Sequence, residues 1–472
     1  MSGFSCCSVL TAILAIALAI FVARKLYPRR AIPTENWEGR YTFTYDHLVR
    51  PSSLEEIVST VKEVNERGGE LKVVGAGHSW SDIASPRDVM MTLSSYTGIV
   101  KVNRKTKEIT AKGGTLVSEI NEELEKHGLG LSVIPSISSG TIAGTIATAT
   151  HSTGINYGNI PSYVVELEIV SGTGIVYRAN RHSNSEIFNA SLVSLGMLGI
   201  ITEITIQCES AYNLHEVVTL EKAEDVVDRV FDVIKSADHV KLWFEINSGM
   251  VQVYRMNRTQ ESCRNQVIHW VETIRVWILE ISAFFMSRFP RVNTVLSPLM
   301  VASGRFLPIR DQINYPPYVF NIPFDLPRHP ESEYSVPIEQ TKDKLIEFMK
   351  IAKHYMTKMA FNLAIEIRFV KADHIWMSSA QGRDSAFFTC LTYNPVDEMF
   401  MKFIEEVRQL LDGRPHWGKL MLTDTEKHLK PKYPNWDDFL RVRNQMDPKR
   451  IFRNEYLERV FPSIYASTAK EL

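Results

Sequence analysis

Residues 73–82 read VVGAGHSWSD, and this stretch carries a predicted strand, Leu71–Val74, into a glycine-rich turn. Glycine has no Cβ, so Gly75 and Gly77 let backbone N–H groups come close to a phosphate. No third glycine opens a helix at the GxGxxG spacing, so the stretch does not indicate a Rossmann site for NAD. His78 is the candidate functional side chain of the turn, although an ordinary loop histidine would give the same pattern.

Residues 138–154 read SSGTIAGTIATATHSTG, a second stretch made almost wholly of small and hydroxyl-bearing residues. Such a segment can line a cleft with backbone groups and hydroxyls, which suits a flat polar ligand. A packing seam of small residues is the alternative. The wider segment from Pro135 to Gly158 has too little side-chain bulk to predict a packed helix. The two stretches together are more specific than either alone.

Helices and strands alternate around these stretches. Ser53, with Glu56 three residues later and apolar residues at helical spacing, predicts a capped helix that ends at Gly68-Gly69. This alternation predicts an α+β domain over about residues 40–210. The other predicted elements are a strand at Ile109–Lys112, a helix at Leu116–His127 and a hairpin of strands at Val164–Val170 and Gly174–Tyr177.

The composition changes after residue 210. Residues 211–260 and 360–395 alternate polar and apolar side chains as antiparallel strands do. Residues 264–305 are rich in aromatic and aliphatic side chains and fit either a buried helix or a membrane-surface segment; we expect a place in the core. A second domain with a largely antiparallel sheet is expected over residues 211–472.

The N-terminal run from Cys6 to Ala23 is almost wholly apolar and is followed by four basic residues up to Arg30. Its length is just short of the ~20 residues that span a bilayer. Ala17-Leu-Ala19 resembles a signal-peptidase site, but the basic residues follow the apolar run instead of preceding it. A retained transmembrane anchor within residues 1–30 is therefore expected, with the catalytic domain in the cytosol. The endoplasmic reticulum is the expected membrane, and the mitochondrial outer membrane is the alternative.

The bulk composition excludes several classes of protein. A formal net charge of −1 gives no bias toward nucleic acid, so no such partner is expected. Five scattered cysteines form neither a disulfide framework nor a zinc cluster, and no metal site is expected.

In order and spacing, the two stretches resemble the PCMH-type FAD-binding domain of the vanillyl-alcohol oxidase superfamily. The nearest resemblance is to the L-gulonolactone oxidase-like aldonolactone oxidase family, over about residues 40–262 and 333–461. Further matching segments are His127–Ser132, Ser194–Glu203, Val336–Lys342, Ile365–Phe369 and Arg414–Lys419.

This resemblance implies bound FAD, attached covalently through His78. Pro135 stands where relatives that use O2 carry glycine or proline, so O2 is the implied electron acceptor. Ala149 departs from the family, which often has glycine there. The residues implied to bind the cofactor are Val74, Gly75, Ala76, Gly77, His78, Ser79, Pro135, Thr141, Gly144, Thr150, His151, Thr153, Gly154, Ile200 and Lys419.

Glu366 and Arg368 are two residues apart on a predicted strand, so their side chains share one face. An exposed cross-strand pair would look the same. The resemblance implies that this Glu-x-Arg faces the flavin and holds a sugar lactone in a substrate (cap) domain over residues 211–472. It also implies that the C-terminal segment of that domain returns to the flavin and places Lys419 near its N1–C2=O edge. His416 and Glu366 are both candidates for the catalytic base, and the choice between them stays open.

The expected reaction is FAD-dependent oxidation of an aldono-1,4-lactone, L-gulono-1,4-lactone first, to a 2-keto lactone that tautomerises to L-ascorbate. O2 would be reduced to hydrogen peroxide. One alternative is a dehydrogenase of the same fold that uses a cytochrome or quinone. Others are oxidation of D-arabinono-1,4-lactone or an alditol, or a non-catalytic flavin-binding membrane protein.

Overall fold

The computed structural model describes residues 32–246, 249–264, 310–321, 328–359, 363–392 and 398–465. The anchor expected within residues 1–30 and almost all of the aromatic-rich segment 264–305 lie outside these ranges. Among the helices of the described ranges, none combines the length and the apolar character needed to cross a bilayer.

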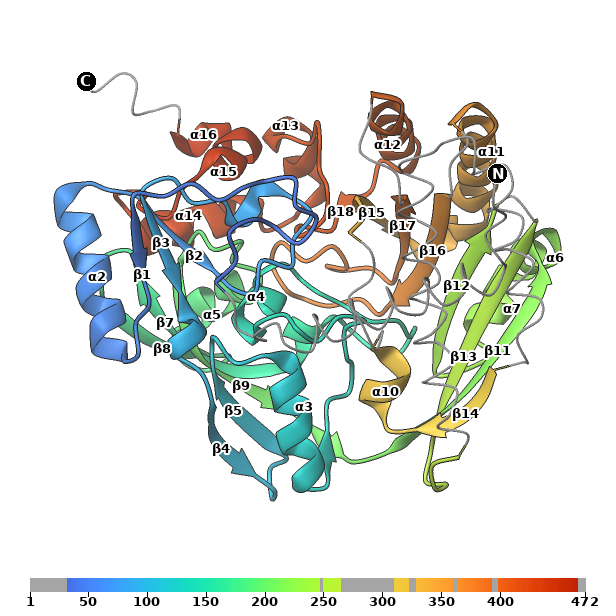
Figure 1. Cartoon of the computed structure of the whole chain (residues 1–472), viewed down its shortest axis with the longest axis horizontal. Coiled ribbons are helices and arrows are strands. Elements are labelled where there is room, and N and C mark those ends of the chain that lie inside the picture. Colours follow the sequence, from blue (N-terminus) through green and yellow to red (C-terminus); the bar gives the residue numbers. More distant parts are fainter. Residues whose placement is uncertain are drawn as a thin grey trace, which may run out of the picture.

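The N-terminal half contains a five-stranded antiparallel sheet, β4-β5-β9-β7-β8, and a three-stranded parallel sheet, β1-β3-β2 (Figure 1). Its larger strands are β1 (His47–Val49), β2 (Leu71–Val74), β3 (Val89–Thr92), β4 (Ile99–Asn103), β5 (Glu108–Lys112), β7 (Val164–Ser171), β8 (Val176–Asn180) and β9 (Gly199–Gln207). A two-residue pair joins β6 (Leu129–Gly130) to β10 (Glu209–Ser210). The helices of this half are α2 (Leu54–Arg67), α3 (Val117–Lys126), α4 (Ile142–Ala147) and α5 (Ser185–Ser191). The mixed α+β class is confirmed.

Helix α2 begins and ends as its sequence predicts. The Ser53 hydroxyl accepts the Glu56 N–H, and Gly68 takes a left-handed conformation at the C-cap. The expectation of no helix between Pro135 and Gly158 is wrong, because α4 forms there. Thr141 caps its first turn, and the buried side chains of Ile142 and Ile146 anchor it to the core.

The second half is built on an eight-stranded antiparallel sheet, β14-β11-β13-β12-β16-β17-β15-β18. The alternation in 211–260 and 360–395 therefore predicted strands correctly. The strands are β11 (Asn213–Lys222), β12 (His239–Glu245), β13 (Met250–Thr259), β14 (Arg310–Asn314), β15 (Glu331–Pro337), β16 (Leu363–Val370), β17 (Ser385–Thr392) and β18 (Arg414–Pro415). The helices are α6 (Ala223–Asp228), α7 (Val230–Ile234), α10 (Pro316–Phe320), α11 (Thr341–Met359) and α12 (Glu398–Leu411).

The two faces of this sheet have different environments. Ile365 and Ile367 of β16 are fully buried in a core that they share with α11 and α12, which cover that face (Figure 1). Side chains alternate across a strand, so Glu366 and Arg368 point to the opposite face. Both are nearly buried there, and that face is turned toward the N-terminal half.

The C-terminal helices return to the N-terminal half. Helices α13 (Glu426–Leu429), α14 (Trp436–Met446), α15 (Glu455–Val460) and α16 (Pro462–Tyr465) share a hydrophobic core with the five-stranded sheet, from which they are distant in sequence. Figure 1 shows α14, α15 and α16 along the upper side of the N-terminal half. The Leu71 N–H donates to the Ile451 carbonyl at 2.8 Å, and Trp436 and Phe461 belong to the core of the five-stranded sheet. The chain thus closes its first half with its last segment.

Candidate active site

Strand β2 leads directly into the glycine-rich turn that holds His78. A Cβ on Gly75 would collide with the Thr141 hydroxyl, so this position must be glycine for the turn to pack against α4. His78 Nε2 lies 2.8 Å from the Ser139 hydroxyl, and its imidazole stacks on Trp37 at 6.1 Å between ring centroids. The two sequence stretches that suggested a cofactor cleft therefore touch at His78.

The hydroxyl-rich stretch is joined to the eight-stranded sheet at its end. The Gly154 N–H donates to the Phe369 carbonyl at 2.6 Å, and the Phe369 N–H donates to the Thr153 hydroxyl at 3.1 Å. Gly154 has φ +143°, and a Cβ there would collide with Tyr157 and His239. This junction brings the end of the stretch beside the β16 residue that follows Arg368.

A third connection comes from the C-terminal segment after β18. The His416 N–H donates to the Glu333 carbonyl of β15 at 3.0 Å, and the Trp80 N–H of the glycine-rich turn donates to the Gly418 carbonyl at 2.8 Å. Lys419 Nζ consequently lies 3.6 Å from the centre of the Trp80 ring and 2.6 Å from Glu331. The segment links the sheet to the turn that contains His78.

Arg368 is held by two carboxylates. Its terminal nitrogen donates to Glu333 Oε1 at 2.6 Å, and its Nε lies 3.3 Å from Glu366 Oε2. The Thr389 hydroxyl also donates to Glu333 Oε1 at 2.7 Å, and Lys241 lies 3.5 Å from the other oxygen of Glu366. Burial opposes the charge of Glu333, but Arg368 and His151 outweigh burial and hold the pKa of Glu333 well below its ordinary value. The guanidinium is thus fixed in position.

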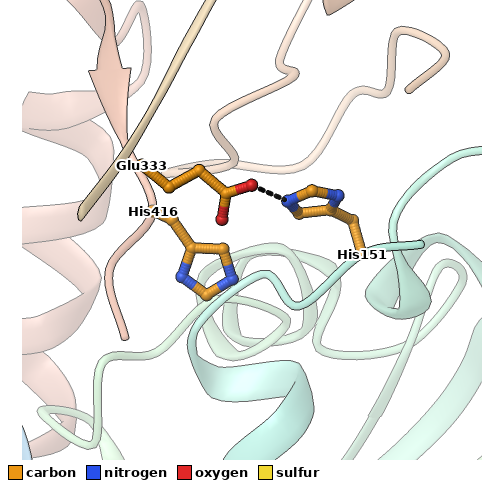
Figure 2. A group of neighbouring side chains, drawn as sticks. All are labelled: His151, Glu333 and His416. Carbon is orange, nitrogen blue, oxygen red and sulfur yellow. Dashed lines mark ion pairs between the residues drawn. The ribbon is translucent and has the colours of Figure 1, made fainter. Parts of the chain in front are cut away.

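His151, Glu333 and His416 form a buried group from three separate segments (Figure 2). His151 Nε2 lies 3.4 Å from Glu333, and the nearest nitrogen and oxygen atoms of all three lie within 4.8 Å of one another. Such a set can bind a metal, but Arg368 and Thr389 already occupy the same Glu333 oxygen. We therefore interpret the group as part of the network of charged and polar side chains that surrounds Arg368.

His416 is a neutral imidazole in this network. Its Nδ1 accepts the Gly418 N–H at 3.1 Å. Burial lowers the pKa of His416 to about 3, and the neighbouring His151, Lys419 and Arg368 act in the same direction against the attraction of Glu333. His416 can donate or accept a hydrogen bond at neutral pH, but it is a weak base.

Lys419 and Glu331 form a second buried ion pair in the site, beside that of Arg368 and Glu333. Burial opposes ionisation of Glu331, but Lys419 and His329 outweigh it and lower the pKa of Glu331 to about 2. Glu331 and Glu333 are two residues apart on β15, so both carboxylates face the site.

These parts surround one cleft with an empty volume of about 1130 Å³, its open mouth included. It joins the glycine-rich turn to the charged face of the sheet. Of the residues predicted from sequence, those that line it are Gly75, Ala76, Gly77, His78, Ser79, Pro135, Thr141, Gly144, Thr150, His151, Arg368, His416 and Lys419.

The remaining five predicted residues do not line the cleft. Val74 and Ile200 are buried in the core, and Thr153 and Gly154 make the junction with β16. Glu366 touches Arg368 at one side of the cleft wall.

Several residues of the site were not predicted from sequence, among them Glu331, Glu333, Lys72 and Ser139. The Glu-x-Glu spacing on β15 was a readable signal, since it is the same pattern as Glu366-x-Arg368. Ser139 lies in the hydroxyl-rich stretch 138–154, but nothing set it apart from the other hydroxyls there. Nothing near Lys72 distinguished it from an ordinary strand residue. Ala149 has φ +56°, a conformation natural to glycine, which accounts for the glycine that relatives often have there.

The cleft fits an FAD. Gly75 and Gly77 have no Cβ, so the backbone of the turn is accessible to a diphosphate. The hydroxyls of Thr141, Thr148 and Thr150 line the wall, and the buried cations Arg368 and Lys419 line the end near the sheet. In fold, the chain matches the crystal structure of a cholesterol oxidase from Brevibacterium sterolicum. The TM-score is 0.70 over 90% of this chain and 96% of that one, at 15% identity. The fold and site define an FAD-dependent oxidoreductase acting on CH–OH groups.

The chain belongs to the D-arabinono-1,4-lactone oxidase family, whose model matches residues 204–460, while an FAD binding domain model matches residues 45–180. It is 30% identical to L-gulonolactone oxidase of Scyliorhinus torazame, over 90% of this chain and 98% of that protein. It is 28% identical to the Bos taurus L-gulonolactone oxidase, over 92% and 99%. It is also 28% identical to the Mycobacterium tuberculosis L-gulono-1,4-lactone dehydrogenase, over 90% and 98%.

Proposed function

We propose that this protein oxidises an aldono-1,4-lactone, L-gulono-1,4-lactone first, to the 2-keto lactone that tautomerises to L-ascorbate. The observation that carries the proposal is the convergence of Arg368, Lys419 and His416 on the cleft that also contains the turn of His78. When bound, FAD supplies the acceptor for the hydride that leaves the substrate carbon.

Arg368 binds the oxygens of the lactone. An arginine has five N–H donors, and Glu333 and Glu366 occupy only part of that set. The two carboxylates hold the guanidinium rigid, so little conformational entropy is lost when the substrate binds.

Glu366, beside Arg368 at one side of the cleft wall, is the group that we propose takes the proton of the reacting hydroxyl as the C–H bond breaks and the C=O bond forms. His416 is the weaker candidate, because burial among cations lowers its pKa to about 3. Instead His416 and His151 hydrogen-bond the oxygens of the ligand or of Glu333.

Lys419 supplies a positive charge beside the glycine-rich turn. A cation next to the cofactor stabilises the negative charge that develops during hydride transfer. Glu331 fixes the position of the ammonium at 2.6 Å, and Trp80 lies beneath it.

We further propose that His78 is bonded covalently to the flavin, with Ser139 orienting the imidazole by its 2.8 Å hydrogen bond. The test is to denature the purified protein in acid: the yellow colour should sediment with the polypeptide. Colour that stays wholly in the supernatant contradicts attachment and leaves bound FAD unaffected.

The electron acceptor is proposed to be O2, supported by Pro135 in the wall of the cleft and by relatives named as oxidases. The relative named as a dehydrogenase supports the second candidate, a lactone dehydrogenase. The test is a panel of L-gulono-, L-galactono- and D-arabinono-1,4-lactones and an alditol, each assayed for O2 consumption and for cytochrome c reduction. O2 consumed with equal peroxide supports the oxidase, and cytochrome reduction without O2 uptake supports the dehydrogenase.

The proposed location is the membrane of the endoplasmic reticulum or, alternatively, the mitochondrial outer membrane. The apolar run from Cys6 to Ala23 supports it. Carbonate washing of fractionated cells tests it: an anchored chain stays in the pellet, and a chain recovered in the wash contradicts the anchor.

A further inference from the structure

Lys72 is a buried lysine in the centre of β2, three residues before Gly75. Its side chain is 3% exposed, and its Nζ has no hydrogen-bond partner in the part of the chain that the structure describes. A strand of a parallel sheet is normally apolar on both faces, and lysine is among the residues least often buried. The position therefore needs an explanation beyond the fold.

The side chain of Lys72 reaches the wall of the cofactor cleft. Lys72 lines the same cleft as Gly75, Gly77 and His78, which follow it in the chain. Its Nζ lies 3.6 Å from where a Cβ on Gly196 would stand, and Gly196 lines the same cleft.

The surroundings of Lys72 do not neutralise its charge. Asp82, in the short 3-10 helix after the turn, is a charged neighbour that attracts the Lys72 ammonium and raises its pKa. That carboxylate is already bound by Arg459 of α15 through two contacts, of 2.9 and 2.8 Å. Burial lowers the pKa of Lys72 to about 7, and Asp82 offsets only part of this. An ammonium buried without a partner destabilises the empty protein.

We propose that Lys72 binds the diphosphate of FAD. The diphosphate is the anionic part of the dinucleotide, and the backbone of the Gly75–Gly77 turn lines the cleft beside Lys72. Nζ donates a charge-assisted hydrogen bond to a phosphate oxygen and so gains the partner that the folded chain does not supply. This rests on the bound cofactor alone and is independent of which lactone is oxidised.

The proposal predicts a pH dependence of FAD affinity. In the flavin-free protein Lys72 loses its proton near neutral pH, whereas the diphosphate raises the pKa of the bound ammonium. Above the pKa of Lys72 in the flavin-free protein, FAD binding therefore takes up a proton. The affinity for FAD should fall by up to about tenfold per pH unit between about pH 7 and about pH 9. Lys72→Met should remove this component of the slope.

The experiment uses the full-length chain with His78→Ala, in which no bond to the cofactor can form at that position. Dissociation constants for FAD, riboflavin, ADP and adenosine are compared with and without Lys72→Met. Loss of one charge-assisted hydrogen bond should weaken FAD and ADP about 10- to 100-fold and leave riboflavin and adenosine within about twofold. Lys72→Arg, which keeps the charge, should recover part of the loss. Lys101→Met, an exposed lysine of β4, is the matched control and should change none of the four.

A second readout separates this role from a structural one. Lys72→Met should raise the melting temperature of the flavin-free protein, because an unpaired buried charge is removed. The proposal would be overturned if Lys72→Met bound FAD with the affinity and the pH slope of the parent. It would also be overturned if the affinity for adenosine fell as much as that for ADP, or if the flavin-free variant melted at a lower temperature than the flavin-free parent. A parent chain that binds no flavin at all would contradict the cofactor assignment instead.

Discussion

Arg368 owes its place to charges that only the folded chain assembles. Glu366 comes from the same strand, but Glu333 comes from β15, and its carboxylate makes the 2.6 Å contact. Thr389 of β17 lies in register between Glu366 and Glu333, and its hydroxyl completes the network. The spacing of Glu366 and Arg368 predicted a shared face. It could not predict Glu333, since cross-strand neighbours depend on strand order.

Replacing Arg368 with lysine should lower kcat/KM for the lactone by about 100- to 1000-fold, because lysine cannot reproduce the planar fork that two carboxylates orient. A loss of this size is about 2.7–4.1 kcal/mol, which is one to two charge-assisted hydrogen bonds at about 1.5–3 kcal/mol each. Steady-state kinetics measures the change, with the flavin spectrum showing that the cofactor is retained. Arg255→Lys, on β13 of the same sheet and bound to Glu221, is the matched control and should keep full activity. An active Arg368→Lys enzyme would contradict the proposed substrate contact.

The pair of Lys419 and Glu331 makes a different prediction, about stability. Lys419→Met leaves Glu331 buried without its main cation and should destabilise the fold by about 3–5 kcal/mol. Lys419→Met combined with Glu331→Gln should recover most of that loss while remaining slow in turnover. Urea unfolding of the two variants measures the difference. Additive losses in the double variant would show that the two side chains do not interact.

At the scale of elements, three connections build the site: the turn after β2, the stretch that ends at Gly154, and the segment after β18. The first two were readable in sequence, because glycine and hydroxyl residues cluster there. The helix α4 was not, since Ile142 and Ile146 are too few to give helical periodicity, and only packing in the core stabilises that short helix. The pairing of the last segment with β15 rests on backbone hydrogen bonds that carry no sequence signature.

The junction at Gly154 should make the protein sensitive to acid. His239 of β12 is buried, stacks on Tyr157 and shares a 2.6 Å hydrogen bond with the Thr153 carbonyl. Burial lowers its pKa from 6.5 to about 4. The unfolded chain therefore binds the extra proton first, and stability is full above pH 6.5 and falls as the pH drops toward 4.

His239→Asn keeps a donor for Thr153 but does not titrate in this range. The free energy of unfolding of the variant should fall less steeply with acid, by about 1.4 kcal/mol per pH unit, than that of the parent. Urea unfolding between the two pKa values measures both slopes. His416, whose pKa is also lowered, contributes the slope that remains. Equal slopes in the parent and the variant would mean that His239 is already protonated in the fold.

At the scale of the whole molecule, the chain is closed by its own C-terminal segment. Asn454 caps α15, and its Nδ2 donates to the carbonyls of Asp82 at 3.1 Å and Ile83 at 3.0 Å, immediately after the glycine-rich turn. Arg459 binds the Asp82 carboxylate. Sequence patterns predicted the two main sheet regions from local periodicity. The family resemblance implied that the C-terminal segment returns to the flavin. Local patterns gave no sign that residues 417–464 pack in the core of the first half, because that packing joins the two ends of the chain.

Asn454→Ala should therefore destabilise the protein by about 2–4 kcal/mol, since it leaves buried carbonyls unpaired and removes a helix cap. It should also loosen the cofactor, because those carbonyls directly follow the turn of His78. Thermal unfolding and flavin retention after dialysis measure the two effects. Asn213→Ala, which removes only exposed hydrogen bonds, to the Glu261 carbonyl and from the Cys263 thiol, is the control and should change neither.

The most direct measurement is the visible spectrum of the purified protein without oxygen, before and after addition of L-gulono-1,4-lactone. Reduction by the lactone should bleach the bound flavin in the parent and in Arg255→Lys, and should be slowed about 100-fold or more in Arg368→Lys. A parent spectrum that stays oxidised with every aldonolactone and alditol tested, while dithionite still bleaches it, would contradict the assignment of this cleft to lactone oxidation.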